Sequence, residues 1–274
     1  MRAVVTGAFD DIGSRDLRLL QEASRLGTLT VLLWDDPSVE SIMGRPPKFA
    51  YSEREYFLKG MRYVSRVVSA NQRSPDALEQ TDSVGADLWA DTPQAGNTRR
   101  REFCAARGLR YHCFAVTDLS GFPELGVDSS VCARRSAPGK KVVVTGCYDW
   151  LHSGHVRFFE EVSTFGDVYA IVGHDANIRL LKGPGHPLLS QEERRYMVGS
   201  IRYVAQALVS TGSGWLDAEP EIERLKPDIY AVNEDGDRGG KREFCRRRGI
   251  EYLVLKRLPA PGLPKRSSTD LRGF

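Results

Sequence analysis

The chain has 274 residues, of which 41% are apolar and 27% are charged, the composition of a soluble globular protein with one large or two small domains. Its net charge of +3 is too small to indicate a nucleic-acid or membrane-surface partner, and no apolar run approaches the roughly 18 residues of a membrane span. The five cysteines form no CxxC pair and the N-terminus enters a strand pattern at once, so we expect a cytoplasmic protein without a signal peptide.

The sequence repeats itself. Four pairs of segments recur in the same order and at a nearly constant offset: 3–10 with 142–149, 51–64 with 191–204, 101–104 with 242–245, and 117–122 with 269–274. Such a pattern predicts a tandem duplication. We expect a first domain over residues 1–122, a second over 140–274, and between them a linker, 123–139, which contains two prolines and two glycines.

Strand and helix patterns alternate within each half. In the second half the predicted strands are 142–145, 168–173, 204–209, 228–232 and 252–255, and the predicted helices are 154–165, 191–200, 217–225 and 239–248. This alternation predicts an α/β fold of two tandem Rossmann-like domains, each a parallel sheet with helices on both faces. Ligands bind beyond the carboxyl ends of such strands, where loop 146–155, the end of strand 228–232 and turn 267–269 should converge.

The segment 142–155 carries the clearest chemical signal. Its three consecutive valines predict a buried strand, and Gly146 lets the chain turn sharply while backbone N–H groups approach a ligand. The helix that begins near His155 directs its unpaired N–H groups to the same place, which favours phosphate binding. His152 and His155 add two further donors there.

The surrounding motifs narrow the chemistry. Lys182, Arg194, Arg202 and Arg257 make the predicted site cationic, whereas a Walker motif, a GxGxxG fingerprint and a nucleophile elbow are all absent. This favours attack of one phosphate on another, with the protein supplying position and positive charge. Each of these residues also has a purely structural interpretation. The two histidines could form a hydrogen-bonded helix cap, Lys182 could be a solvated loop residue, and Arg194 and Arg202 could lie on a helix surface. A nucleophilic role for Cys147 is disfavoured, because this chemistry needs no thiolate.

Residues 146–155 resemble the GxFDxxHxGH signature of the cytidylyltransferase-like nucleotidyltransferases, and residues 266–271 resemble their ISSTxx signature. Between them, segments at Lys182, Arg194 and Arg202 resemble the KG, ER and RYV segments of that family. The resemblance covers residues 142–272 in order. It is nearest to the phosphoethanolamine enzyme, itself a tandem duplication, and to the glycerol-3-phosphate cytidylyltransferase.

The resemblance implies transfer of CMP from CTP to a small phosphomonoester or phosphonate, like phosphoethanolamine or glycerol 3-phosphate, with release of pyrophosphate and with Mg²⁺ accompanying CTP. It implies catalytic roles for His152, His155 and Lys182, and acceptor binding by Arg194 and Arg202. The residues that it implies for nucleotide or phosphate binding are Gly146, Cys147, Tyr148, Asp149, Gly154, Asp235, Arg257, Ser267, Ser268 and Thr269. No resident metal ligands can be assigned.

Three positions depart from the family pattern: Ala205 replaces an aspartate, Arg266 replaces an isoleucine, and 233–235 differs by one residue from GDD. Two other functions therefore stay open. One is an adenylyltransferase acting on a sugar phosphate, as in ADP-heptose synthesis, and the other is a non-catalytic nucleotide-binding sensor or scaffold.

In the first half, residues 13–16 stand where the second half has its two histidines, and they read Gly-Ser-Arg-Asp. An aspartate there would repel a triphosphate. We expect the first half to be non-catalytic and to serve as an intrachain dimerisation partner, with a further homodimer left open.

Overall fold

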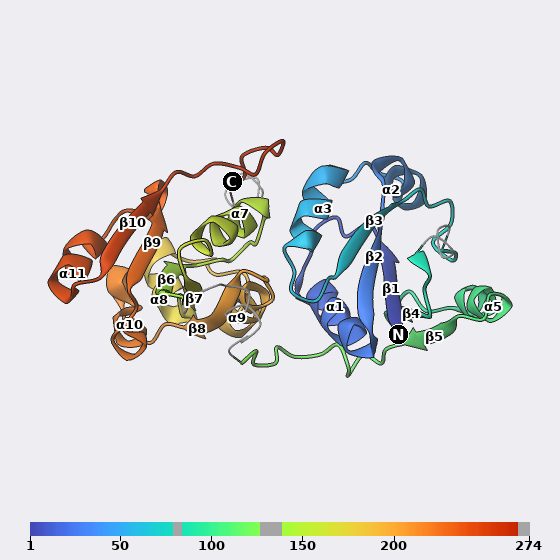
Figure 1. Ribbon diagram of the computed structural model, residues 1–274, viewed down its shortest axis with the longest axis horizontal. Coiled ribbons are helices and arrows are strands. Elements are labelled where there is room, and N and C mark those ends of the chain that lie inside the picture. Colours follow the sequence, from blue (N-terminus) through green and yellow to red (C-terminus); the bar gives the residue numbers. More distant parts are fainter. Residues whose placement is uncertain (79–83, 127–138, 268–274) are drawn as a thin grey trace. The chain divides into compact units, whose positions relative to one another are not determined.

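The computed structural model describes residues 1–78, 84–126 and 139–267. The chain forms two compact units, Met1–Gly121 (unit 1) and Phe122–Phe274 (unit 2), each of them α/β (Figure 1). Among the described residues, no helix has both the length and the apolar composition that crossing a bilayer requires.

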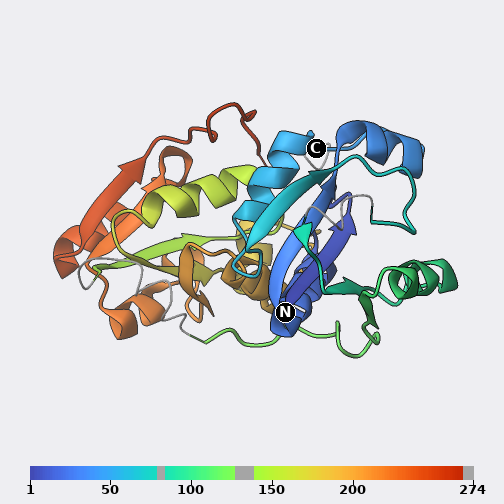
Figure 2. The same cartoon turned by 45° about the vertical axis from the view of Figure 1, so that its right-hand side comes forward.

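Unit 1 is built on a five-stranded parallel sheet in the order β3-β2-β1-β4-β5, whose three longest strands run side by side in Figure 2. Its strands are β1 (Arg2–Gly7), β2 (Thr28–Trp34), β3 (Arg66–Ala70), β4 (Leu88–Asp91) and β5 (Arg110–Cys113). Its helices are α1 (Ser14–Leu26), α2 (Asp36–Met43), α3 (Tyr51–Lys59) and α5 (Thr98–Ala106).

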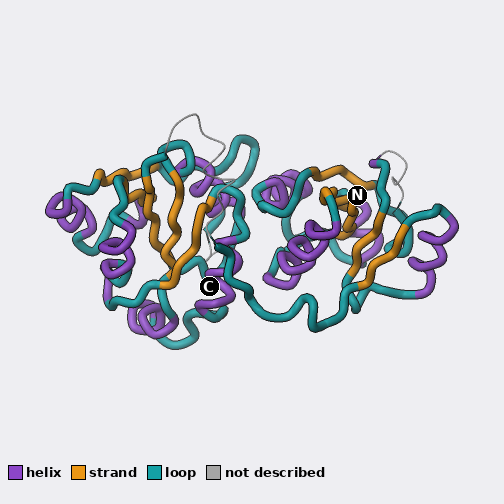
Figure 3. The backbone as a smooth tube through the Cα atoms, turned by 60° about the horizontal axis from the view of Figure 1, so that its bottom comes forward, coloured by secondary structure: helices purple, strands orange, loops and turns teal. Residues whose placement is uncertain are grey.

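Unit 2 has a second five-stranded parallel sheet, in the order β10-β9-β6-β7-β8, and helices flank the strands of both sheets (Figure 3). The strands are β6 (Lys141–Gly146), β7 (Asp167–Val172), β8 (Val204–Val209), β9 (Ile229–Asn233) and β10 (Glu251–Leu255). The helices are α7 (Ser153–Val162), α8 (Asp175–Lys182), α9 (Gln191–Gly199), α10 (Glu219–Leu225) and α11 (Lys241–Arg248), with 3₁₀ turns η1 (Gly214–Leu216) and η2 (Glu234–Gly236). Read from β8, this order is equivalent to that of unit 1.

The predicted α/β class with parallel sheets is confirmed, and each predicted strand of unit 2 lies within two residues of its observed bounds. Helix α8 is absent from the helices predicted above, because the sequence pattern between strand 168–173 and helix 191–200 indicates a loop that contains Lys182. Its N-cap is His174, whose Nδ1 accepts the N–H of Asn177 at 3.2 Å. Histidine is not a common N-cap residue, so the pattern gave no start signal. Lys182 thus ends a helix rather than lying within a loop.

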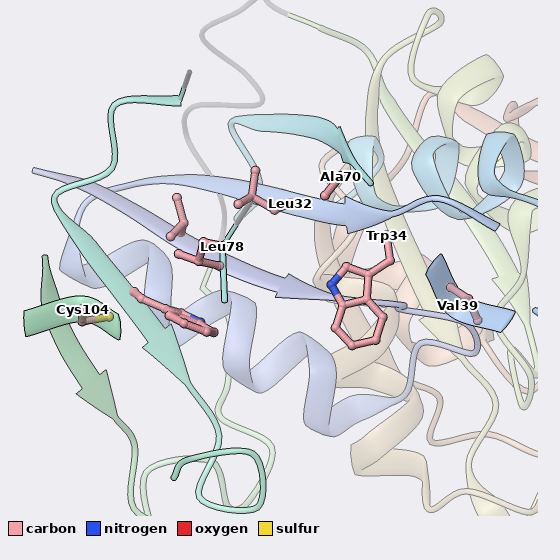
Figure 4. Close-up of a cluster of buried hydrophobic side chains, with 8 residues drawn as sticks. Leu32, Trp34, Val39, Ala70, Leu78 and Cys104 are labelled. Carbon is pink, nitrogen blue, oxygen red and sulfur yellow. The ribbon is translucent and has the colours of Figure 1, made fainter. Parts of the chain in front are cut away.

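The core of unit 1 contains a tryptophan at the carboxyl end of β2. Trp34 packs in one buried cluster with Leu32, Val39 and Ala70, and its Nε1–H donates to the hydroxyl of Thr6 at 2.8 Å (Figure 4). By strand register, the equivalent position in unit 2 is Gly173, directly after β7. An indole therefore occupies this position in unit 1, whereas the equivalent position in unit 2 has no side chain.

A fully buried arginine ties three segments of unit 2 together. The guanidinium of Arg194 (0% exposed) donates to the carbonyl oxygens of Leu189 at 3.0 Å and Cys147 at 2.7 Å, and to the carboxylate of Asp175 at 2.7 Å. We call this set the arginine clamp. It fixes the loop after β6 to the start of α8 and to the segment before α9.

Unit 1 contains the same clamp. Arg54 donates to the carbonyl oxygens of Phe49 at 2.9 Å and Ala8 at 2.5 Å, and to the carboxylate of Asp36 at 2.6 Å. Because the clamp is present in both units, it belongs to the frame that holds the loop and does not depend on the histidines of unit 2.

A buried carboxylate reinforces the frame on the other side of the loop. Asp149 accepts the N–H groups of Leu188 at 2.8 Å and Leu189 at 3.0 Å. Asp10 accepts two successive N–H groups in the same way in unit 1. The loop after the first strand of each unit is thus held at two points.

The arginine clamp yields a stability prediction. Arg194→Met should lower the free energy of unfolding of unit 2 by about 3 kcal/mol, because it leaves two buried carbonyls and a carboxylate without their donor. Arg54→Met should do the same to unit 1. Chemical denaturation measures both, with the exposed Arg242→Ala as the control. A wild-type midpoint in both methionine variants would contradict the clamp.

Candidate active site

A cavity of about 620 Å³ opens where the carboxyl ends of β6 and β9 meet the start of α7. Ser268 and Thr269 lie outside the described residues. Of the other residues predicted for the site, all but Arg194 and Arg202 line this cavity: Gly146, Cys147, Tyr148, Asp149, His152, Gly154, His155, Lys182, Asp235, Arg257 and Ser267.

The turn after β6 depends on a glycine and on a strained tyrosine. Tyr148 has a φ of 52°, in the left-handed region that costs a non-glycine residue on the order of 1 kcal/mol. Its ring folds back over Gly146, where an added Cβ would lie 2.7 Å from the tyrosine Cζ. In unit 1, Phe9 has a φ of 45° at the same position. Both units therefore retain this turn, which brings the backbone to the cavity.

The two histidines hold each other through the backbone at the start of α7. His152 is the N-cap, and its Nδ1 accepts the N–H of Gly154 at 3.1 Å. The Nδ1 of His155 in turn accepts the N–H of His152 at 3.4 Å, and the ring centroids lie 4.0 Å apart. This reciprocal arrangement is a capping box in which imidazoles replace the usual hydroxyl and carboxylate. We call it the histidine box.

The histidine box decides which nitrogen carries the proton. A neutral imidazole has one N–H donor and one acceptor, and in both rings Nδ1 is already the acceptor. The proton therefore resides on Nε2. Burial, together with nearby His152, Arg257 and Lys182, holds the pKa of His155 well below its usual 6.5. His155 is thus a neutral N–H donor at physiological pH.

Positive charge reaches the cavity from two sides. Lys182 is exposed at the end of α8 and has no ion pair among the described residues, which leaves its ammonium available to an anion. Arg257, which follows β10, pairs with the carboxylate of Asp235 and donates to the carbonyl oxygen of Arg266 at 3.0 Å. Asp235 is 49% exposed in its side chain. Its pairing with Arg257 leaves carboxylate surface free to meet a polar ligand.

Two cavity residues act mainly on the protein itself. Asp149 directs its oxygens at backbone N–H groups, so it positions the loop rather than presenting its charge to a ligand. Burial raises the pKa of the Cys147 thiol above its usual value, although Lys182 and Arg194 oppose the shift. A thiol that is harder to ionise is a poor nucleophile, which agrees with the sequence interpretation.

The predicted contacts of Arg194 and Arg202 with an acceptor find no support in their positions. Neither side chain lines the cavity. Arg194 is fully buried in the arginine clamp, where each end of its guanidinium already has an acceptor. Arg202 is half-buried, beyond the end of α9. The family resemblance implied acceptor binding for both residues, whereas its place in the fold gives Arg194 a positioning role.

The sequence interpretation missed a second cavity and a lysine. A space of about 160 Å³ adjoins the first and shares Thr145, Gly146, Cys147, Lys182 and Lys241 with it. Its other walls are formed by the ends of β7 and α8 and by the loop around η1: Gly173, Asn177, Ile178, Leu181, Gly214, Trp215 and Asp217. The sequence signal that could have identified Lys241 is its position directly after Gly239 and Gly240, just beyond the acidic segment 234–237.

The loop that forms the second cavity is held rigidly. The side-chain amide of Asn177 (2% exposed) donates to the carbonyl of Gly214 at 3.1 Å and accepts its N–H at 2.7 Å. The hydroxyl of Ser210 donates to Asp217 at 2.6 Å. Trp215, 53% exposed, is therefore presented at the cavity by a fixed backbone.

Unit 1 has no imidazole at the positions that correspond to the histidine box. Gly13 is the N-cap of α1, and its N–H donates to the carboxylate of Asp16 at 2.9 Å. The cap is thus retained with a carboxylate in place of His155. Burial raises the pKa of Asp16. No histidine donor remains there for a phosphate.

Comparison with known proteins finds similarity in unit 2, which contains the cavity. The profile of the cytidylyltransferase-like family matches residues 143–273, which lie in unit 2. The FAD synthase of Ferroglobus placidus is 37% identical over 43% of this chain and 75% of that protein, and that of Aciduliprofundum boonei is 32% identical over 48% and 84%. The bifunctional protein HldE of Geobacter sulfurreducens is 35% identical over 40% of this chain, but the match spans only 22% of that longer protein.

The lowered pKa of His155 yields a prediction on pH. The unfolded histidine takes up a proton near pH 6.5 and the folded one does not, so stability should fall as the pH drops below about 6.5, by at most about 1.4 kcal/mol per pH unit. The melting temperature should therefore drop less between pH 7.5 and 5.5 in His155→Gln than in the wild type. An equal drop in both proteins would contradict a neutral His155.

Proposed function

Because this chain belongs to the cytidylyltransferase-like family of nucleotidyltransferases, we propose that unit 2 transfers a nucleoside monophosphate from a nucleoside triphosphate to a phosphate-bearing acceptor and releases pyrophosphate. The observation that carries this proposal is the histidine box. It presents two imidazoles with fixed tautomers in a cationic cavity at a helix N-terminus.

In the proposed reaction, an oxygen of the acceptor phosphate attacks the α-phosphorus of the nucleotide. The bond from that phosphorus to the oxygen of the β-phosphate breaks, and pyrophosphate leaves. Both reactants are already ionised near neutral pH, so no proton has to be removed before the attack. The protein's task is to hold two anions together and to stabilise the negative charge that collects on the phosphate oxygens.

The residues of the cavity suit that task. The Nε2–H groups of His152 and His155 are donors that need no reorganisation, because the backbone has already fixed both rings. Lys182 and Arg257 add positive charge, each worth up to about 4 kcal/mol at 4 Å and an effective dielectric constant of about 20, before desolvation. The neutral His155 adds a hydrogen bond without adding to the repulsion among these cations.

ATP is the first candidate for the nucleotide. The similarity to two FAD synthases, which form an adenine dinucleotide, favours adenylyl transfer. CTP is the second candidate, favoured by the resemblance of residues 146–155 and 233–235 to cytidylyltransferase signatures. Asp235 does not decide between them, since adenine and cytosine both offer an exocyclic amine to a carboxylate.

The second cavity is the proposed place for the body of the acceptor. Its volume of about 160 Å³ favours a small molecule such as glycerol 3-phosphate, phosphoethanolamine or a sugar phosphate. Trp215 offers an apolar face and Asp217 an acceptor for a hydroxyl or amine. Magnesium would enter with the triphosphate as part of the substrate, because the described residues contain no group of three or more potential metal ligands.

Unit 1 is proposed to be a non-catalytic copy. Its equivalent strand order, its arginine clamp and its strained aromatic turn support descent of both units from one duplicated domain. Its lack of the histidine box supports loss of the reaction. The intrachain pairing of the two halves, like any further homodimer, stays a prediction.

The histidine box can be tested by truncation. His152→Ala or His155→Ala should lower kcat by roughly 10²–10⁴, because each removes a fixed donor to the transition state. Pyrophosphate release under saturating substrate measures the effect, and His112→Ala in unit 1 is the matched control. Near-normal turnover in either variant, with its fold intact, would contradict the assigned roles.

The substrates can be identified with a panel. ATP, CTP, GTP and UTP would each be combined with phosphoethanolamine, glycerol 3-phosphate, phosphocholine, a phosphonate, hexose 1-phosphates and riboflavin 5′-phosphate. We expect pyrophosphate release with ATP that requires one of these acceptors. Release with CTP alone would select the cytidylyl reaction instead. Nucleotide binding, detected by thermal shift, without release in any combination would contradict the enzyme and favour a sensor.

A further inference from the structure

Lys241 lies on the wall that the two cavities share. It is the first residue of α11 and only 9% exposed, yet it lines both spaces. Its ammonium donates to the carbonyl oxygen of Gly236 at 3.1 Å and lies 5.9 Å from the ring centroid of Tyr230. Within residues 1–78, 84–126 and 139–267, no carboxylate lies within ion-pair distance of it.

Unit 1 has an arginine at the equivalent position. Arg100 precedes the repeated segment 101–104 as Lys241 precedes 242–245, and it lies 5.1 Å from the ring of Trp89. Trp89 pairs with Val4 of β1 as Tyr230 pairs with Val143 of β6, so the two cations occupy corresponding places.

The cation of unit 1 is neutralised. Arg100 donates to the buried carboxylate of Asp91 at 2.6 Å and approaches Asp76 at 3.3 Å. The hydroxyl of Tyr111 also donates to Asp91, at 2.7 Å. In this network the carboxylates of the protein itself neutralise the positive charge of Arg100, so the charge is not available to a ligand.

Unit 2 retains the cation but not the carboxylate. By register, the residue that corresponds to Asp91 is Val232, which lines the larger cavity. Lys241 is therefore a buried ammonium on a cavity wall, and a valine stands at the register position where unit 1 has its carboxylate. Burial lowers its pKa, with Asp217, Asp237 and Asp235 opposing the shift from a distance. A buried charge without a counter-ion is unfavourable by several kcal/mol, and such an arrangement calls for an anion supplied from outside.

We propose that Lys241 binds a substrate phosphate group at the junction of the two cavities. The inference rests on the proposed function and deepens it, because the junction is where the acceptor phosphate and the nucleotide phosphates must meet. Lys182 lines the same two cavities, so the two lysines together flank the junction. Either substrate can supply the phosphate, and the two arms of the experiment separate them.

Binding of inorganic phosphate and of inorganic pyrophosphate, measured by calorimetry, tests this role. Phosphate represents the acceptor and pyrophosphate represents the nucleotide. Lys241→Met keeps the length of the side chain over Tyr230 and removes the charge, and at least one affinity should fall tenfold or more. Lys241→Arg should stay within about threefold, and so should Lys226→Gln, an exposed lysine that lines neither cavity.

Val232→Asp gives a second variant. It places in unit 2 the carboxylate that unit 1 tolerates at this position, so the fold should persist while the affinity for the anion falls at least tenfold, because the new carboxylate neutralises Lys241 and also repels the anion directly. The melting temperature of Lys241→Met should equal or exceed that of the wild type, because the variant removes an uncompensated buried charge. A lysine with only a structural role would instead lower it.

Unchanged affinities for both anions in Lys241→Met would overturn the inference, as would a wild type that binds neither anion. An equal loss in Lys226→Gln would overturn it too, since the effect would then be one of general charge. If the anion affinity depends on Lys241 but no nucleotide and acceptor pair releases pyrophosphate, the phosphate site stands and the proposed function fails.

Discussion

The candidate site depends on the buried arginine clamp behind it. Arg194 binds the carbonyl of Cys147 and thereby fixes the loop that carries the histidines, and it holds Asp175 at the start of the helix that ends in Lys182. Asp149 holds the same loop from the other side. The histidine box then needs only local backbone contacts to orient its rings. Preorganisation of this kind allows neutral donors to contribute to catalysis without reorganising when the substrate arrives.

The two units share this frame and differ where chemistry would occur. The differences between the units cluster at the carboxyl ends of the strands. The differing pairs, with the residue of unit 2 first and that of unit 1 second, are His152 and Gly13, His155 and Asp16, Gly173 and Trp34, and Val232 and Asp91. In each pair, unit 2 has a hydrogen-bond donor, an open space or a charge without a counter-ion among the described residues. At the same position unit 1 has a side chain or backbone group that is hydrogen-bonded, ion-paired or packed. Comparison with unit 1 therefore indicates which features of unit 2 are energetically costly and so are candidates for a functional role.

The sequence was sufficient to predict what local pattern determines. Consecutive valines predicted β6, and the spacing of His152 and His155 after a glycine turn predicted the site. It was insufficient where long-range contacts decide: the sequence around Arg194 gave no sign that the guanidinium points inward to two carbonyls. Lys241 was missed for a similar reason. Lys241 is notable because, in the part of the chain that the structure describes, it has no carboxylate partner like the Asp91 of unit 1. Only the strand register shows that Val232 occupies the position of that aspartate.

We infer that the backbone fixes the imidazoles of His152 and His155 as Nε2–H donors, and we propose that they donate to a nucleotide phosphate. Long-range ¹⁵N–¹H NMR of the histidine rings, recorded at pH 7 with and without nucleoside triphosphate, tests it most directly. The account predicts protonated Nε2 and unprotonated Nδ1 in His152 and His155, with both Nε2 protons shifting when the nucleotide binds. Protonation at Nδ1 of either ring, or rings whose signals ignore a bound nucleotide, would contradict it.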